Sequence, residues 1–147
     1  MTTCECINSM WFFFLDRITY PNRTSQRIQQ NEFGEIIGLT HQTNGMAGYE
    51  ELHKYDGLGN IVEINRTRGN QSSNERFSYD GLNRLVQEDI EPEQIKYVYD
   101  ERGNRQQRST TFDEDQPTTK QTHYSYNAAN MLNRFSDKEE GTEYFGT

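Results

Sequence analysis

Three histidines, two cysteines and 23 acidic residues are the side chains of this sequence that could support catalysis or hold a metal ion. His53 lies two residues before Tyr55, where other parts of the chain carry an aromatic ring, so we expect it to pack. His123 alternates with Tyr124, and because neighbouring strand residues point to opposite faces, we expect His123 to face solvent. His41 ends a strand-like run with no serine or cysteine motif near it. We therefore expect no enzyme, although a His/Asp/nucleophile group assembled only by the fold stays open.

The cysteines and the densest acidic run do not form a recognisable metal site. Cys4 and Cys6 make a lone C-x-C pair, whereas a structural zinc site usually has four ligands. Residues two apart on a strand are also poorly placed for a mutual disulfide. The run from Asp113 to Asp115 lacks the spacing, glycine and final glutamate of an EF-hand, so we expect a solvated loop. We expect no metal and no cofactor.

Composition excludes some partners and leaves two structural alternatives. The net charge is −8, and nucleic acids are bound through basic patches, so we expect no nucleic-acid partner. Leu, Ile, Val and Phe together account for 27 of 147 residues, a share low enough to be typical of disordered chains, whereas nine tyrosines can bury large rings in a β structure. The apolar run from Met10 to Leu15 is too short to span a membrane and is not a signal peptide, so the compartment is unknown.

An internal repeat decides between disorder and β structure. Four segments align without gaps, and a weaker fifth copy, with its leading tyrosine replaced, precedes them. The copies are Gln30 to Leu39 (QNEFGEIIGL), Tyr55 to Ile64 (YDGLGNIVEI), Tyr79 to Glu88 (YDGLNRLVQE), Tyr99 to Arg108 (YDERGNRQQR) and Tyr126 to Phe135 (YNAANMLNRF). Their starts are 20 to 27 residues apart, and such variable spacing favours hairpins with loops of different length.

Each copy carries the residues of a tight hairpin turn. Asp or Asn follows the leading position, at Asn31, Asp56, Asp80, Asp100 and Asn127. Gly or Asn comes three residues later, at Gly34, Gly59, Asn83, Gly103 and Asn130. An Asx side chain can hydrogen-bond its own turn, and Gly or Asn tolerates the left-handed conformation that closes a type I turn with a bulge. The pattern predicts turns at 56–59, 80–83, 100–103 and 127–130, with positive φ at their fourth residues.

The flanks of the turns are typical of strands. Phe77 and Tyr79, like the pairs Tyr97/Tyr99 and Tyr124/Tyr126, should share one sheet face. After the turn, Ile36, Ile61, Leu85 and Leu132 occupy matching positions, and Arg105 breaks this pattern. Full burial of such a side chain contributes about 1.5–3 kcal/mol, so we expect this row to hold the sheet together. The polar stretches 65–76, 89–94, 109–121 and 136–143 should be return turns, with Pro92 second in the turn 91–94.

The motif Y-D-x-x-G-N/R followed by an apolar strand resembles the YD repeat of the rearrangement-hotspot (RHS) family. That family includes polymorphic bacterial toxins, shell components of insecticidal toxin complexes and the animal teneurins. The resemblance covers roughly 28–135 and implies an all-β fold, in which tandem antiparallel β-hairpins form part of a curved sheet within a spiral shell. It also implies that the repeat positions are structural: Tyr55, Asp56, Gly59, Tyr79, Asp80, Asn83, Tyr99, Asp100, Gly103, Tyr126, Asn127 and Asn130.

The sequence suggests a repeat region with a different N-terminal segment. We expect 1–20 to be non-repeat sequence, with disorder left open, and 21–147 to hold about five hairpin units, truncated at both ends. Bacterial members often end their repeats with G-R-F-x-S-x-D-P, associated with aspartate-dependent self-cleavage. Arg134 to Asp137 matches it only faintly.

The resemblance implies a non-catalytic shell segment that, in a full-length parent, helps to encapsulate a C-terminal toxin or effector domain. Partners would be the remaining repeats and the enclosed domain, and the parent would be extracellular or in the cell wall. The isolated segment should self-associate through exposed strand edges. The alternative is a glycan- or protein-binding module with a tyrosine-lined sheet face. It depends on whether the tyrosines are packed or exposed: Tyr79, Tyr97, Tyr99 and Tyr126.

Overall fold

The computed structural model describes residues 2–9, 12–112, 118–139 and 142–146, which form thirteen β-strands and no helix. The chain divides into two compact units, Met1–Asn74 and Glu75–Thr147. The first unit contains β1 (Thr3–Ser9), β2 (Phe12–Thr19), β3 (Thr24–Gln30), β4 (Ile36–Thr43), β5 (Met46–Tyr55) and β6 (Ile61–Arg68). The boundary falls within β7 (Gln71–Tyr79), and the second unit continues with β8 (Leu85–Ile90), β9 (Glu93–Tyr99), β10 (Arg105–Phe112), β11 (Thr118–Tyr126), β12 (Leu132–Glu139) and β13 (Thr142–Gly146).

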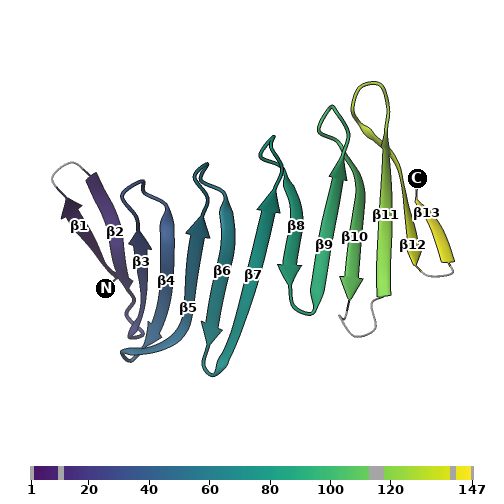
Figure 1. Ribbon diagram of the computed structural model, residues 1–147. Helices are drawn as coiled ribbons and strands as arrows, with labels where there is room; N and C mark the ends of the chain where they lie inside the picture. Colours follow the sequence, from purple (N-terminus) through teal and green to yellow (C-terminus); the bar gives the residue numbers. More distant parts are fainter. Residues whose placement is uncertain (1, 10–11, 113–117, 140–141, 147) are drawn as a thin grey trace. The chain divides into compact units, whose positions relative to one another are not determined.

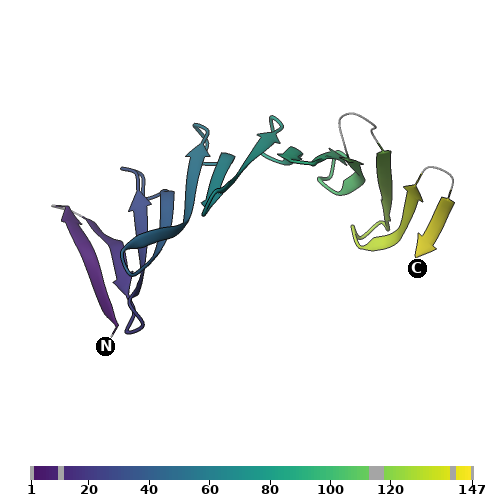
Figure 2. The same ribbon diagram turned by 90° about the horizontal axis from the view of Figure 1, so that it is seen from below.

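Within each unit, every strand lies beside the strands that precede and follow it in the chain. The registers determined for these neighbours are antiparallel, as β3 with β4 and β9 with β10 illustrate. Figure 1 shows this succession of hairpins, and Figure 2 shows β1 to β6 following one another from a second direction. The prediction of an all-β chain of tandem antiparallel hairpins is therefore confirmed, and the alternative of a disordered repeat region is wrong.

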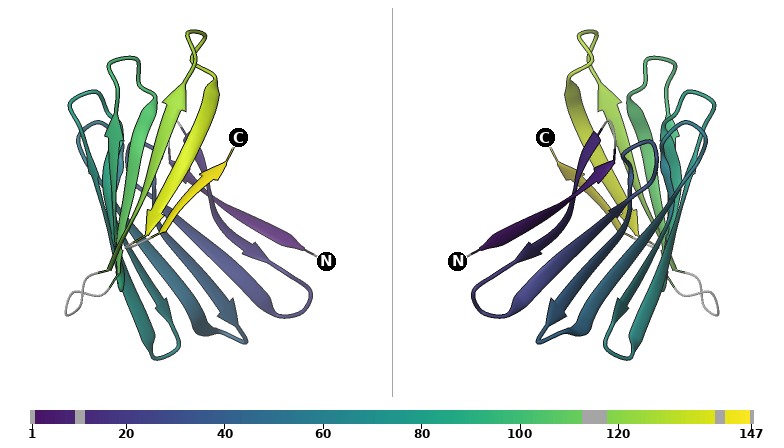
Figure 3. Two further views of the ribbon diagram at one scale, coloured as in Figure 1. Left: turned by 90° about the vertical axis from the view of Figure 1, so that its right-hand side faces the viewer. Right: turned by 90° about the vertical axis from the view of Figure 1, so that its left-hand side faces the viewer.

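The predicted turns lie where the repeat places them. In each, the amide of the fourth residue donates to the carbonyl of the Asx residue, as from Gly59 to Asp56 (3.2 Å). The fourth residues all have positive φ: Gly34 (82°), Gly59 (83°), Asn83 (66°), Gly103 (86°) and Asn130 (58°). A bulge follows each of these turns. After the turn at 80–83, Leu85 pairs with Tyr79 and Gln87 with Ser78, so the ladder skips Val86. In the second unit these turns lie at one end of the strands (Figure 3).

Side chains alternate along the strands as predicted. The leading tyrosines and the aromatic residues two positions before them are half-buried, whereas the residues between them, Ser78, Val98 and Ser125, are exposed. The expected core is only partly right. Ile61 and Leu85 are half-buried, but Ile36 is 38% exposed and Leu132 54%. Among the described residues the buried large apolar side chains are Ile64 and Ile95. Among the described residues no helix packs on a sheet face, so most apolar side chains in both units are only partly covered.

The return turns are much shorter than the polar stretches suggested. Most of 65–76 belongs to β6 and β7, which are joined by Gly69 and Asn70 alone. Thr110 and Thr122 are even among the most buried residues (3% and 8% exposed), because a threonine can fill a strand position without making the sequence apolar. The turn at Pro92 spans 90–93, and Pro92 is its third residue rather than its second.

The described parts of 1–20 include β1 and β2. These strands pair in antiparallel register, with a register shift between Glu5 and Cys6. Arg27 on β3 bonds Asp16 on β2 through Nε and Oδ1 (3.2 Å). The predicted boundary at residue 20, between non-repeat and repeat sequence, stays a prediction.

Candidate functional site: a network of turns and tyrosines

The Asx residue of each turn acts as a hydrogen-bond acceptor for the whole turn. Oδ1 of Asp56 accepts the backbone amides of Leu58 and Asn60, both at 2.9 Å, and Oδ2 accepts Nδ2 of Asn60 at 2.9 Å. Asp100 repeats this arrangement with Asn104. Each aspartate thus binds two backbone amides and one side chain within five residues, which closes the turn without help from other strands.

These contacts stabilise the charged form of the aspartates. The Asn60 side chain is the main cause that lowers the pKa of Asp56. Arg84 does the same for Asp80, and Asn104 does so for Asp100. The shared cause is hydrogen bonding to the carboxylate, which favours the ionised state.

The two turns that begin with asparagine differ from each other at the fifth residue. Oδ1 of Asn31 accepts the amides of Phe33 and Glu35, and its Nδ2 donates to Oε2 of Glu35 (2.6 Å). Oδ1 of Asn127 accepts its two amides in the same way, but the fifth residue there is Met131, which has no polar atom for Nδ2 of Asn127.

The leading tyrosine of a repeat binds the hairpin before it. The hydroxyl of Tyr55 donates to the carbonyl of Ile36 (2.8 Å), and that of Tyr99 donates to the carbonyl of Leu85 (2.8 Å). Tyr126 reaches the carbonyl of Arg105 at 3.0 Å. Each acceptor is the first residue of the strand after the preceding turn. The tyrosine therefore connects neighbouring hairpins by a contact that the strand ladder does not supply.

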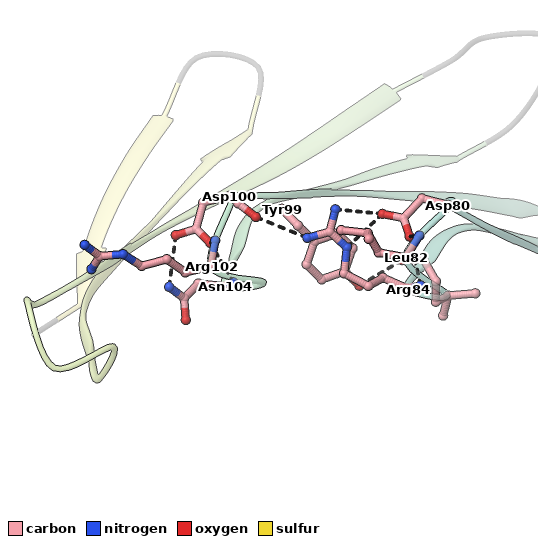
Figure 4. A network of polar contacts seen from close by, with 8 residues as sticks. Asp80, Leu82, Arg84, Tyr99, Asp100, Arg102 and Asn104 are labelled. Atoms are coloured by element: carbon pink, nitrogen blue, oxygen red, sulfur yellow. Dashed lines mark hydrogen bonds and ion pairs between the residues drawn. The ribbon is translucent and has the colours of Figure 1, made fainter.

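Arg84 forms a second link between neighbouring turns (Figure 4). Its guanidinium binds Oδ2 of Asp80 through Nε and Nη2, both at 2.7 Å, and donates from Nη1 to the carbonyl of Asp100 (3.1 Å). It also lies over the ring of Tyr99, 4.8 Å from the centroid. At the next turn, the shorter Asn104 reaches Oδ1 of Asn130 (3.2 Å).

Arg105 breaks the apolar pattern because it packs between aromatic rings. Its guanidinium carbon lies 4.6 Å from the ring centre of Tyr124 and 5.6 Å from that of Tyr97. Cation–π contacts of this kind contribute about 0.5–1 kcal/mol when exposed and more when desolvated. An arginine can thus replace the aliphatic residue of the other copies.

A polar cluster on β5 and β6 was missed by the sequence analysis. Glu51 accepts from the Tyr49 hydroxyl, bonds Nε2 of His53 and accepts Nε of Arg66 (3.1 Å). Burial raises the pKa of Glu51, but the hydrogen bonds from Tyr49, His53 and Arg66 outweigh burial and lower this pKa to about 2. The signal was the spacing of Tyr49, Glu51 and His53, which places all three on one face of β5.

The other candidate residues do not converge. His53 is half-buried with its ring centre 6.4 Å from that of Tyr55, whereas His123 is exposed as predicted and His41 is exposed beside the Tyr49 ring. The side chains of Cys4 and Cys6 and the run 113–115 lie outside the described residues. Within the described part of the chain, no group of three or more His, Cys, Asp or Glu residues could hold a metal ion. No helix there is long and apolar enough to cross a membrane.

The twelve predicted repeat positions form turns and strand ends. The aspartates, Asn127 and the glycine or asparagine residues occupy the turns, and the four tyrosines end β5, β7, β9 and β11. The predicted positions did not include the residue that follows each turn, whose side chain, where it is polar, bonds the Asx side chain or the next turn. The sequence did indicate this residue, because the motif ends in Asn or Arg at Asn60, Arg84 and Asn104.

Comparison with known proteins identifies a similar fold. No protein-family model matches the chain, and no curated protein matches it. The solved structures of TcdB2-TccC3 without its hypervariable C-terminal region and of TcdB2-TccC3-Cdc42 each superpose with a TM-score of 0.58, at 12% and 13% identity. In both cases the match covers 89% of this chain and 9% of the other chain. At this identity the likeness is one of fold.

Proposed function

We propose that this chain is a non-catalytic structural segment of an RHS/YD-repeat shell, which in a full-length parent helps to enclose a C-terminal toxin or effector domain. The observation that carries the proposal is the repeated bond from a leading tyrosine to the preceding hairpin, at Tyr55, Tyr99 and Tyr126. A contact that recurs from one hairpin to the next suits a wall built by addition of repeats.

The fold likeness supports the same proposal. The chain spans 9% of the length of the TcdB2-TccC3 chains that it matches, which is the relation expected of a segment to a larger assembly. One of those structures lacks a hypervariable C-terminal region, and a variable C-terminal domain is what the proposed shell would enclose. We propose an extracellular or cell-wall location for the parent on the family resemblance, and the remaining repeats and enclosed domain as partners.

The tyrosines give less support to a glycan-binding face. Tyr97, Tyr99 and Tyr126 are half-buried rather than open platforms. The hydroxyl of Tyr97 donates to Glu88, and those of Tyr99 and Tyr126 donate to backbone carbonyls. A sugar would have to compete with these bonds, so we do not adopt this alternative.

The proposal is tested in the longer protein encoded in frame with this segment. We expect further YD repeats in the flanking sequence and a downstream domain that resists limited proteolysis while the repeats are folded. The double change Tyr99→Ala and Tyr126→Ala should expose that domain to cleavage, because it removes two contacts between hairpins. Tyr20→Ala, which alters an exposed turn residue outside the repeat, is the matched control.

Two results would overturn the proposal. One is flanking sequence that encodes no repeats. The other is a downstream domain that is cleaved at the same rate whether or not the repeat region is present.

A further inference from the structure

The second unit contains two successive junctions between turns, and only the first is filled by an arginine. Arg84 immediately precedes Leu85, whose carbonyl accepts the hydroxyl of Tyr99. In the same way, Asn104 immediately precedes Arg105, whose carbonyl accepts the hydroxyl of Tyr126. At the first junction the guanidinium of Arg84 contacts three groups: the carboxylate of Asp80, the carbonyl of Asp100 and the ring of Tyr99. A carboxylate, a backbone carbonyl and an aromatic ring therefore form the binding environment of a guanidinium at this junction.

The second junction offers the same three groups without the arginine. They are the carboxylate of Asp100, the carbonyl of Asn127 and the ring of Tyr126. All three residues line a groove of about 640 Å³ between the two turns. Asn104 also lines this groove, but its carboxamide ends at Oδ2 of Asp100 and Oδ1 of Asn130. It is several bonds shorter than an arginine and leaves the outer part of the junction open.

The groups that face this space can accept further hydrogen bonds. The carbonyl of Asn127 accepts the Asn130 amide (3.0 Å), as that of Asp100 accepts the Gly103 amide (3.1 Å). A carbonyl oxygen can accept two hydrogen bonds, and the second position on Asp100 is the one that Arg84 uses. At Asn127 the described contacts leave this position unused.

The charge around the groove suits a single cation. The chain carries a net charge of −8, and Asp100 and Glu101 both line the groove. Arg102 lines it as well, with an exposed side chain that extends away from Asp100 in Figure 4, so the groove is lined by two acidic side chains and one basic one. The corresponding residues of the neighbouring turn are Gly81 and Leu82, so this turn adds both an acidic residue, Glu101, and a basic one, Arg102.

We propose that this groove binds the guanidinium group of an arginine side chain presented by a partner protein. The arginine binds Asp100 and the carbonyl of Asn127 and stacks on Tyr126, as Arg84 does one repeat earlier. The carboxylate and carbonyl supply directional acceptors for the planar donor fork, and the ring supplies a cation–π surface. This inference is independent of the proposed shell function, because it rests on the comparison of two junctions in one chain.

The test is an NMR titration of the folded chain with methylguanidinium, with methylammonium at equal ionic strength as the matched cation. We expect saturable shifts of the Tyr126 and Asn127 signals with methylguanidinium, with a Kd on the order of millimolar for so small a probe. An arginine-containing peptide should compete for the same signals better than its lysine counterpart.

Two variants separate this site from general attraction of cations. Asn104→Arg places an internal guanidinium in the groove and should weaken probe binding by about tenfold or more, without loss of folding. Arg84→Asn should create a second site, seen as new methylguanidinium-dependent shifts at Tyr99 and Asp100. Arg102→Ala should tighten binding, because it removes a like charge from the rim.

Three outcomes would overturn the proposal. They are the absence of saturable shifts at Tyr126, equal responses to methylguanidinium and methylammonium, and unchanged binding in folded Asn104→Arg protein.

Discussion

The phenol of Tyr126 donates a hydrogen bond of 3.0 Å to the backbone carbonyl of Arg105, 21 residues earlier in the chain. The register of β10 shifts between Arg105 and Gln107, so this carbonyl lies at a bulge where the regular ladder is interrupted. The tyrosine thus satisfies an acceptor that strand pairing leaves over. Tyr99 stands in the same relation to Leu85, which begins β8 after the preceding turn.

Tyr126→Phe tests the energetic weight of this contact. The ring stays and only the hydroxyl is lost, so the free energy of unfolding should fall by about 0.5–1.5 kcal/mol, the net contribution of one such hydrogen bond. Urea denaturation followed by circular dichroism measures the change. Tyr20→Phe, at an exposed turn residue, is the control and should have little effect. Equal effects of the two substitutions would show that the hydroxyl contact contributes nothing.

Substitutions at Gly103 test the effect of backbone conformation on stability without a steric clash. Its φ is +86°, and a Cβ placed there would meet no atom within 4 Å. Gly103→Asn should be tolerated, since Asn83 and Asn130 adopt positive φ at the same turn position. Gly103→Val should destabilise the fold by at least about 1 kcal/mol more than Gly103→Asn, because a β-branched residue resists this region. Equal stability of both variants in urea melts would contradict the turn assignment.

Glu51 should give the stability of the chain a dependence on acid. Its pKa is about 2, below the ordinary value of 4.5, so its ionised form stabilises the folded state. That contribution is complete above about pH 5 and is lost as pH falls through the folded pKa. The difference in unfolding free energy between the native chain and Glu51→Gln should therefore shrink from pH 6 to pH 2 in urea melts. Glu50→Gln, exposed on the opposite face of β5, is the control and should show no such trend.

The isolated chain should self-associate, and added salt should promote this. Phe33, Leu58 and Leu82 are 80%, 78% and 72% exposed at the tips of their turns, where they offer apolar surface to other molecules. The net charge of −8 opposes association, and salt screens that repulsion. Sedimentation velocity across salt concentrations measures the effect, and replacement of the three residues by serine should reduce it. A monomer at every salt concentration would rule this prediction out.

The sequence was most informative where backbone conformation limits the choice of residue. Asp80 and Asn83 identify a turn because few residues accept hydrogen bonds from their own turn or tolerate positive φ. It was least informative where contacts depend on long side chains. The roles of Arg84 and Arg105 depend on which ring or carbonyl the next hairpin brings near. Thr110 is buried in a polar stretch, so apolar periodicity could not indicate that β10 continues through it.

The acceptor of each tyrosine has an evolutionary consequence. The tyrosine hydroxyl binds a backbone carbonyl oxygen, which every amino acid provides. Residues as different as Ile36, Leu85 and Arg105 can therefore act as the acceptor. Each Asx turn, in addition, is closed within its own five residues. As far as this bond is concerned, a gene segment that encodes one hairpin can therefore be duplicated, deleted or exchanged by recombination without a compensating mutation at the acceptor residue. Arrays of this kind can change in length and drift widely in sequence while the junctions between their units stay intact.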